Sequence, residues 1–252
     1  MARLIILGAT GSLGRHVLDQ ALAAGHQVTV LVRTPAKLPP EAGRSASTHT
    51  GDLNSLAPAD LAGLVSGHDA LINCAGHVTA HEKFVNLINR VVASVELLRP
   101  PQPVCWFLAG AALLDIDAAG RRGVELPKVK STYWPHRINF DRLERSGLDW
   151  RLLCPGPMVE QPALGLDRLR ISLDTLPVQV PAFARALPAP LLVPLFAALV
   201  PQMIVPYADA AALMLANIDP GNEMARRRVG LALPAGMRGR KPQWAAKAAS
   251  QA

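Results

Sequence analysis

Three glycines close to the start of the chain, Gly8, Gly11 and Gly14, have the spacing of a backbone cradle for a pyrophosphate. The first glycine permits a tight turn, the second lets the backbone approach the phosphates, and the third lets the following helix pack against the strand. The N-terminus of that helix offers free N–H groups and the positive end of the helix dipole. Ordinary strand-to-helix turns share this spacing, but its place directly after the apolar run from Leu4 to Leu7 favours phosphate binding.

Arg33 closes a second apolar run, from Gln27 to Val32, at the position that faces the adenosine ribose in a dinucleotide-binding fold. An acidic residue there would bind the ribose 2′-hydroxyl, whereas an arginine accommodates a 2′-phosphate. Arg33 therefore favours NADP(H) over NAD(H), with Arg15 or Lys37 as further cations. The alternative is a solvated loop arginine.

Histidines supply the other candidate chemistry. His77 and His81 are four residues apart after a further apolar run, with Cys74 nearby. A metal site, contact with a substrate and ordinary loop histidines are the three interpretations. Because no HExxH pattern is present, we predict no metal. His136 could bind a substrate or donate a proton near neutral pH, and capping of the surface is an equal alternative.

Strands and helices that alternate along the chain must position these residues. Apolar runs predict strands over residues 4–7, 27–32, 70–76, 104–110 and 148–158, with a short edge strand before Gly51. Amphipathic segments predict helices after Gly14 and over residues 56–65, 84–98 and 132–146, whereas residues 34–48 are predicted to be loop. This alternation predicts an α/β fold with a doubly wound parallel sheet, a Rossmann-like NAD(P)-binding fold.

The pattern changes beyond Val159. No charged residue occurs between Ala186 and Pro206, but the prolines in this segment argue against an uninterrupted membrane span. Short helices over a pocket, a dimer face and a peripheral membrane contact are the alternatives. We predict an NAD(P)-binding domain over residues 1–160 and a smaller, Pro-rich, mostly helical substrate region over residues 161–252. A helix over residues 207–218 and a strand over residues 227–233 are expected to return to the first domain.

Composition narrows the class of protein. Half of the 252 residues are hydrophobic and 18% are charged, which is enough for a large core. The net charge is +7, but no helix-turn-helix, zinc-finger or interleaved basic and aromatic pattern predicts sequence-specific nucleic-acid binding. Three cysteines without ligand spacing indicate a reducing compartment, and the first apolar run is too short for a signal peptide. We expect a cytoplasmic monomer or homodimer.

Several motifs together resemble the short-chain dehydrogenase/reductase superfamily, and more narrowly its atypical, NmrA-like NAD(P)H-binding branch. They are GATGSLG at residues 8–14, Arg33, GDL at residues 51–53, NCAG at residues 73–76 and SGLDWRLLCPGPM at residues 146–158. The resemblance implies cofactor contacts along the whole dinucleotide. The pyrophosphate would be contacted by Gly8, Thr10, Gly11, Ser12, Leu13 and Gly14, and the 2′-phosphate would be contacted by Arg33. The adenine would lie beside Asp52 and Leu53, and the ribose would lie along Asn73, Cys74 and Ala75. The nicotinamide would lie near Pro155, Gly156 and Pro157.

Active members of that superfamily use a serine, a tyrosine and a lysine. The resemblance places the tyrosine at Tyr133 and puts Arg137 where the lysine would be, four residues along one helix face. An arginine there keeps the positive charge that lowers the pKa of a tyrosine, but it cannot carry a proton. The serine position reads Ala-Gly-Ala at residues 109–111 and offers no hydroxyl. The triad is therefore degenerate.

We expect an NADPH-dependent reductase of a small hydrophobic carbonyl or quinone-like substrate. One alternative is a non-catalytic NADP(H) redox sensor that binds a partner protein. An NAD(P)-dependent epimerase or isomerase is a second. A third is a peripheral membrane protein that uses residues 186–206 and the basic tail as contacts.

Overall fold

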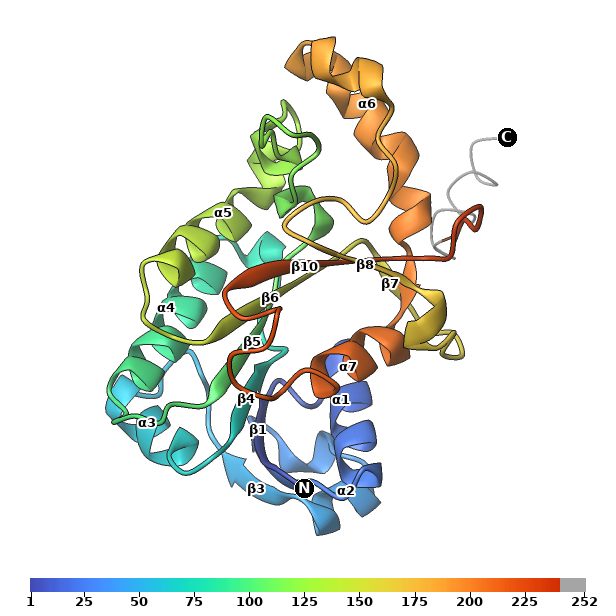
Figure 1. The fold of residues 1–252 in the computed structure, drawn as a ribbon. Coiled ribbons are helices and arrows are strands. Elements are labelled where there is room, and N and C mark those ends of the chain that lie inside the picture. Colours follow the sequence, from blue (N-terminus) through green and yellow to red (C-terminus); the bar gives the residue numbers. More distant parts are fainter. Residues whose placement is uncertain (241–252) are drawn as a thin grey trace.

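An eight-stranded sheet forms the centre of the computed structural model, which describes residues 1–240 (Figure 1). The strands are β1 (Arg3–Leu7), β2 (Gln27–Val32), β3 (Ser47–Thr50), β4 (Ala70–Asn73), β5 (Val104–Leu108), β6 (Trp150–Pro155), β8 (Arg170–Leu173) and β10 (Arg227–Ala232). Their order across the sheet is β3-β2-β1-β4-β5-β6-β10-β8. All neighbouring pairs are parallel except β10 and β8. A separate parallel pair consists of β7 (Met158–Val159) and β9 (Val205–Pro206).

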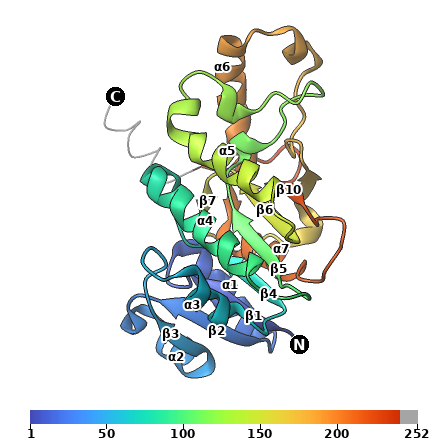
Figure 2. The same cartoon turned by 90° about the vertical axis from the view of Figure 1, so that its left-hand side faces the viewer.

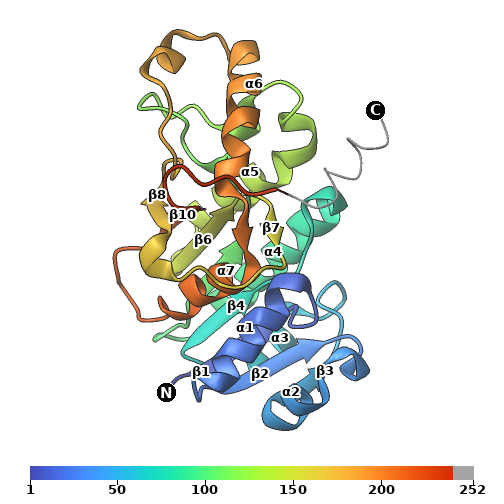
Figure 3. The ribbon, with the colours of Figure 1, turned by 90° about the vertical axis from the view of Figure 1, so that its right-hand side faces the viewer.

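Helices cover both faces of this sheet. They are α1 (Ser12–Ala23), α2 (Pro40–Ser45), α3 (Pro58–Val65), α4 (Glu82–Glu96), α5 (Lys130–Glu144), α6 (Ala189–Leu199) and α7 (Tyr207–Leu215). On one face α3, α4 and α5 lie side by side (Figure 2). On the other face α1 packs between α2 and α7 (Figure 3). The sheet is therefore wound in both directions from its centre.

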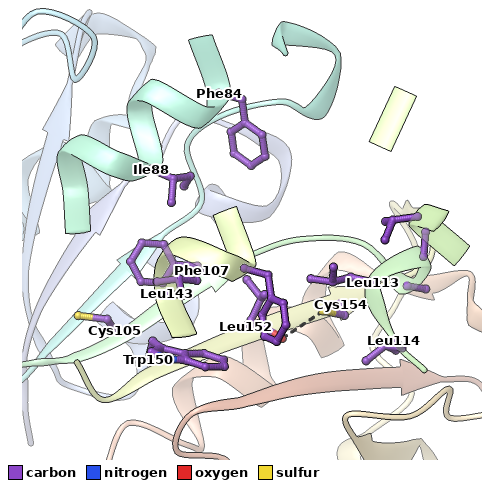
Figure 4. Packing of buried hydrophobic residues seen from close by; sticks show 14 of the residues in the cluster. Phe84, Ile88, Cys105, Phe107, Leu113, Leu114, Leu143, Trp150, Leu152 and Cys154 are labelled. Atoms are coloured by element: carbon purple, nitrogen blue, oxygen red, sulfur yellow. Dashed lines mark hydrogen bonds between the residues drawn. The ribbon is translucent and has the colours of Figure 1, made fainter. Parts of the chain in front are cut away.

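The central strands are apolar along their whole length because helices bury both of their faces. Leu4 and its three successors in β1 have no exposed surface. Under α4 and α5, Phe107 of β5 and Leu152 of β6 belong to one hydrophobic cluster with Ile88 and Leu143 (Figure 4). Burial on two faces explains why uninterrupted apolar runs mark these strands in the sequence.

The predicted α/β fold with a doubly wound, Rossmann-like sheet is confirmed. The expected edge strand before Gly51 is β3, which pairs in parallel with β2. The prediction of loop over residues 34–48 is wrong, because the segment contains a 3₁₀ turn at Pro35–Lys37 and the helix α2. Prolines occupy the first turn of both elements, where a missing N–H costs nothing. The antiparallel strand β8 was not predicted.

The C-terminal part of the chain contributes to the sheet and to α6, whose buried Leu192, Phe196 and Leu199 belong to the same hydrophobic cluster as Phe107. β10 lies between β6 and β8, and α7 packs against α1. α6 stands at the end of the molecule away from β3 (Figure 1). Within residues 1–240 no helix has both the length and the apolar character needed to cross a membrane. Most of the basic tail expected to contact a membrane lies outside the described residues.

Candidate functional site

The turn between β1 and α1 forms a cradle of backbone groups. Gly8 has a φ of +79°, and a Cβ on it would lie 2.7 Å from the backbone nitrogen of Ala75. The N–H of Gly11 donates to the carbonyl oxygen of Gly8 over 3.0 Å and closes the turn. A Cβ on Gly14 would collide with that same carbonyl. Glycine is therefore required where strand and helix come closest.

The N-terminus of α1 is left open for an anion. Gly11 occupies the cap position, no side chain of the described residues caps the helix, and the first turn carries no acidic residue. The N–H groups of Ser12, Leu13 and Gly14 begin the helix, and the first N–H groups of a helix have no partner within it. Such free donors, aligned with the helix dipole, bind phosphate.

A cleft of about 440 Å³ lies at the carboxyl ends of β1, β2 and β4, beside this cradle. Ligands of open α/β sheets bind at this edge. Eight residues predicted to bind the cofactor line it, namely Gly8, Thr10, Gly11, Arg33, Asp52, Leu53, Cys74 and Ala75. His77, predicted as a substrate contact, also lines the cleft, together with Lys83 and Phe84 of α4.

Two cations face the cleft without a partner. Arg33 is exposed, and neither it nor Lys83 forms an ion pair or side-chain hydrogen bond with any residue in the part of the chain that the structure describes. Lys83 was not predicted, although a lysine in the first turn of the helix that follows β4 could have indicated it. The cleft therefore offers two positive charges to an anionic ligand.

Asp52 is an acidic residue in the lining of the cleft. Its carboxylate accepts hydrogen bonds from the backbone N–H and the side-chain amide of Asn54, both at 2.9 Å. The bond from the backbone of Asn54 is the main reason that the pKa of Asp52 is lowered, and the charge of Arg33 lowers it further. Asp52 is therefore an anion that fixes its own loop.

The predicted cofactor residues at the ends of β4 and β6 differ in how they lie relative to the cleft. Asn73, at the end of β4, is fully buried, and its Oδ1 accepts a hydrogen bond from the N–H of Ala75 at 3.2 Å. Burial raises the pKa of the Cys74 thiol to about 12, so at neutral pH it contributes shape and no charge. Pro155 ends β6, and Gly156 packs against Met203 ahead of Pro157. These last three residues do not line the cleft.

Arg15, considered as a further phosphate contact, is engaged elsewhere. Arg15 and His16 both bind the carboxylate of Glu160, and the His16 bond measures 2.9 Å. Hydrogen bonds from His16 and then Arg15 lower the pKa of Glu160. The segment after β7 is thereby attached to α1 beside the cradle. Lys37 does not line the cleft.

The three histidines have different surroundings. Nδ1 of His77 lies 2.7 Å from the hydroxyl of Thr79, and the ring of His81 meets Trp134 edge-on with centroids 6.1 Å apart. His136 is buried in α5. Among residues 1–240 no three histidine, cysteine or carboxylate side chains come together in a way that could hold a metal.

α5 carries both residues that the resemblance makes catalytic, and neither of them lines the cleft. Tyr133 is 37% exposed and stacks on His136. Arg137 faces solvent on the outer side of the helix, where its Nε is 3.9 Å from the carboxylate of Asp141. Arg137 therefore does not approach the cleft, and His136 is one of the buried side chains of the helix, together with Pro135, Asn139, Phe140 and Leu143.

A glycine turn, an uncapped helix end and a cleft at the switch between α3–α5 and α1–α2 define a dinucleotide-binding α/β protein. The chain belongs to the NAD(P)H-binding family, whose model matches residues 8–175. The NAD(P)H-binding character that the resemblance implies is thereby confirmed. Its cofactor is a nicotinamide dinucleotide, and the cradle fits that group's pyrophosphate.

Solved structures from bacteria share this fold. A Rossmann-fold NAD(P)-binding family protein from Shigella flexneri is 20% identical, with a TM-score of 0.63 over 96% of this chain and 98% of that one. The oxidoreductase ylbE from Lactococcus lactis is 15% identical, with a TM-score of 0.67 over 99% of this chain and 97% of that one. A short-chain dehydrogenase/reductase from Veillonella parvula is 16% identical, with a TM-score of 0.64 over 96% of this chain and 99% of that one. At these identities the similarity is one of fold.

Proposed function

We propose that the protein is an NADPH-dependent reductase of a small hydrophobic carbonyl or quinone-like substrate. The observation that carries the proposal is Arg33, an unpaired cation among residues 1–240 that lines the dinucleotide cleft next to the adenosine side. Lys83 adds a second positive charge to the lining of the cleft. A 2′-phosphate would supply the anion that both side chains lack, and a 2′-hydroxyl would not.

The substrate end supports an apolar, planar acceptor. Beyond Ala75 the cleft continues to Phe84, and the rings of His81, Trp134 and Tyr133 stand close to the start of α4 and α5. When bound, the nicotinamide would supply a hydride to the acceptor. The chain's part is to hold the acceptor between aromatic rings and to return a proton, for which the partly exposed Tyr133 is the candidate.

The cofactor preference is tested by substituting Arg33→Gln. Loss of a charge-assisted contact to phosphate should weaken NADPH binding about ten-fold or more and leave NADH binding unchanged. Lys37→Gln removes a nearby exposed cation that does not line the cleft and is the matched control. Calorimetric titration of both variants with both dinucleotides is the measurement. Equal binding of NADPH by wild type and Arg33→Gln would contradict the preference.

The reductase activity is tested by single-turnover oxidation of NADPH. Menadione and hydrophobic aldehydes should oxidise the bound cofactor, and absorbance at the reduced nicotinamide band reports it. Tight NADPH binding without oxidation by any acceptor would count against the proposal.

A non-catalytic NADP(H) sensor is the second candidate, because residues 109–111 offer no hydroxyl and Arg137 points to solvent. A sensor would capture different partner proteins with NADPH, with NADP⁺ and without nucleotide. Identical captures in the three states, together with turnover, would reject the sensor.

A further inference from the structure

His136 is a buried polar side chain whose hydrogen-bonding capacity is not satisfied by the described residues. Only 6% of its surface is exposed, and its Nδ1 atom is buried with no hydrogen-bond partner among the described residues. Its ring instead lies between two aromatic rings, stacked on Tyr133 at 6.0 Å and edge-on to Phe84 at 5.8 Å. An unpaired buried polar group is costly, and a functional role is one reason that a protein keeps such a group.

The ring is neutral, and its surroundings select one tautomer. Burial lowers the pKa of His136 to about 4, with a smaller contribution from His77, so the imidazole carries one proton at neutral pH. Burying Nδ1 as a bare acceptor costs less than burying an unpaired N–H. The proton is therefore assigned to Nε2, which makes this atom a hydrogen-bond donor.

The Nε2 atom of His136 lies next to Gly110, a residue without a side chain just after the end of β5. It lies 3.3 Å from the position that a Cβ on Gly110 would take. Gly110 follows β5, at the same carboxyl edge of the sheet as the cleft, and the triad serine is missing from this segment. The ring of Phe84, which lines the cleft, lies edge-on to the His136 ring. The imidazole thus lies next to Gly110 on one edge and next to a ring that lines the cleft.

We propose that the Nε2–H of His136 donates a hydrogen bond to the carbonyl oxygen of the hydride acceptor, in place of the hydroxyl that residues 109–111 lack. This inference rests on the proposed reductase function. In the reaction, the acceptor carbon gains a C–H bond from the donated hydride and the π electron pair of its C=O bond moves to oxygen. The oxygen then takes the proton of the Tyr133 hydroxyl, and Tyr133 regains a proton from water. His136 keeps its own proton and stabilises the developing negative charge.

Two substitutions at this position test the proposal. His136→Leu removes the donor at similar volume and should lower kcat about 100-fold, as the loss of one oxyanion donor does elsewhere. The melting temperature should stay level or rise, because an unpaired polar atom has been replaced by an apolar group. His136→Gln places an amide N–H near the former Nε2 and should retain most of kcat. NADPH affinity should be unchanged in both variants.

His68 provides the matched control, because it is a histidine with a purely structural environment. Its ring nitrogens lie 3.2 Å from the carbonyl of Val65 and 2.8 Å from the hydroxyl of Thr29. His68→Leu should lower the melting temperature and leave kcat unchanged. A His136→Leu variant that behaves like His68→Leu, or a His136→Gln variant as inactive as His136→Leu, would overturn the proposal.

A spectroscopic readout separates this inference from the proposed function. In ¹⁵N-histidine-labelled protein, the resonance missing from His136→Gln identifies His136. Its Nε2 signal should report a protonated nitrogen at neutral pH and should shift when menadione is added to the NADP⁺ complex, in which no hydride can move. If wild-type protein oxidises NADPH but this signal does not shift, the inference fails and the reductase stands. If no acceptor is reduced, the reductase fails, and an unshifted signal overturns the inference as well.

Discussion

Arg228 of β10 is a charged side chain almost wholly removed from water, and its partners lie in the segment after β5, in α5 and at Asp174 after β8. Its Nη1 and Nη2 donate to the two carboxylate oxygens of Asp115 at 2.9 and 3.0 Å, and Nη1 also donates to the carbonyl of Leu113 at 2.7 Å. The guanidinium carbon lies 5.0 Å from the centre of the Phe140 ring, on the inward side of α5. A buried charge of this kind is tolerated only while its partners remain.

Replacing Asp115 with Asn should therefore lower the free energy of unfolding by about 3 kcal/mol, because Arg228 would keep its charge without its bidentate partner. Burial alone would raise the pKa of Asp115, but hydrogen bonds and charge from Arg228 and Arg122 outweigh it and hold the pKa below its ordinary value. Stability from this carboxylate is thus present at neutral pH and lost as the pH falls through the lowered pKa. The free energy of unfolding measured with urea should fall on acidification in the wild type, and it should fall less in Asp115→Asn.

Asp141→Asn is the contrasting control. Asp141 forms an exposed pair with Arg137, and such pairs contribute about 0.5 kcal/mol or less. Similar losses in the two variants would show that the Arg228 network is not a buried ion pair in solution.

Elements differ in how well a sequence marks them. β1 and β5 are marked by apolar runs because both faces of each strand are buried, whereas only one strand pairs with the edge strand β8, and all of its residues keep some exposure. The existence and approximate length of α5 could be predicted, but not its inward face. That face carries Pro135, His136 and Asn139 among its buried residues, so hydrophobic periodicity does not identify it.

Some residues of the candidate site could likewise be predicted from the sequence, and others could not. Glycine spacing indicates the cradle, because backbone conformation restricts the residue type there. The apolar strand ends indicate where the cleft opens. Lys83 and Phe84 were missed because they are ordinary helix residues that matter only through the packing of α4 beside β4. The inward position of His136 likewise depends on how α5 is rotated, which residue types alone do not specify.

At the scale of elements, the contact between α1 and β1 is the most sensitive feature of the cradle. Gly14→Ala should lower the free energy of unfolding by about 3 kcal/mol and abolish NADPH binding, because the added methyl meets rigid backbone at Gly8. Gly63→Ala is the control, since Gly63 lies in α3 with open space around it and alanine is the better helix former. Its stability should rise by up to about 1 kcal/mol, measured by the same urea titration. A folded Gly14→Ala variant with wild-type affinity for NADPH would contradict the close packing.

The whole molecule depends on residues far apart in the chain. β10 completes the sheet by pairing with β6 on one side and β8 on the other. Arg228 of β10 then connects this late strand to the segment after β5. The sheet therefore includes strands from both sides of residue 160, and β10 lies in the segment 227–233 that we expected to return to the first domain.

A chain that ends at Asp219 lacks β10 and should not unfold cooperatively, because β6 would have an unpaired edge and β8 no partner. A chain that ends at Arg240 keeps every described element and should melt like the full protein. Circular dichroism melts of the two truncations measure the difference. Cooperative melting of the shorter chain near the wild-type temperature would show that residues 1–219 suffice for the fold.

The place of β10 in the sheet also bears on biosynthesis. A ribosome delivers β1 to β6 in an order that lets each join a neighbour already made, but β8 emerges before β10, the one strand with which it pairs among the described residues. In the nascent protein β8 has no partner strand until β10 has been synthesised. β10 must then insert between β6 and β8. During that interval the edge of β6 is open to chaperones, proteases and other unfinished copies.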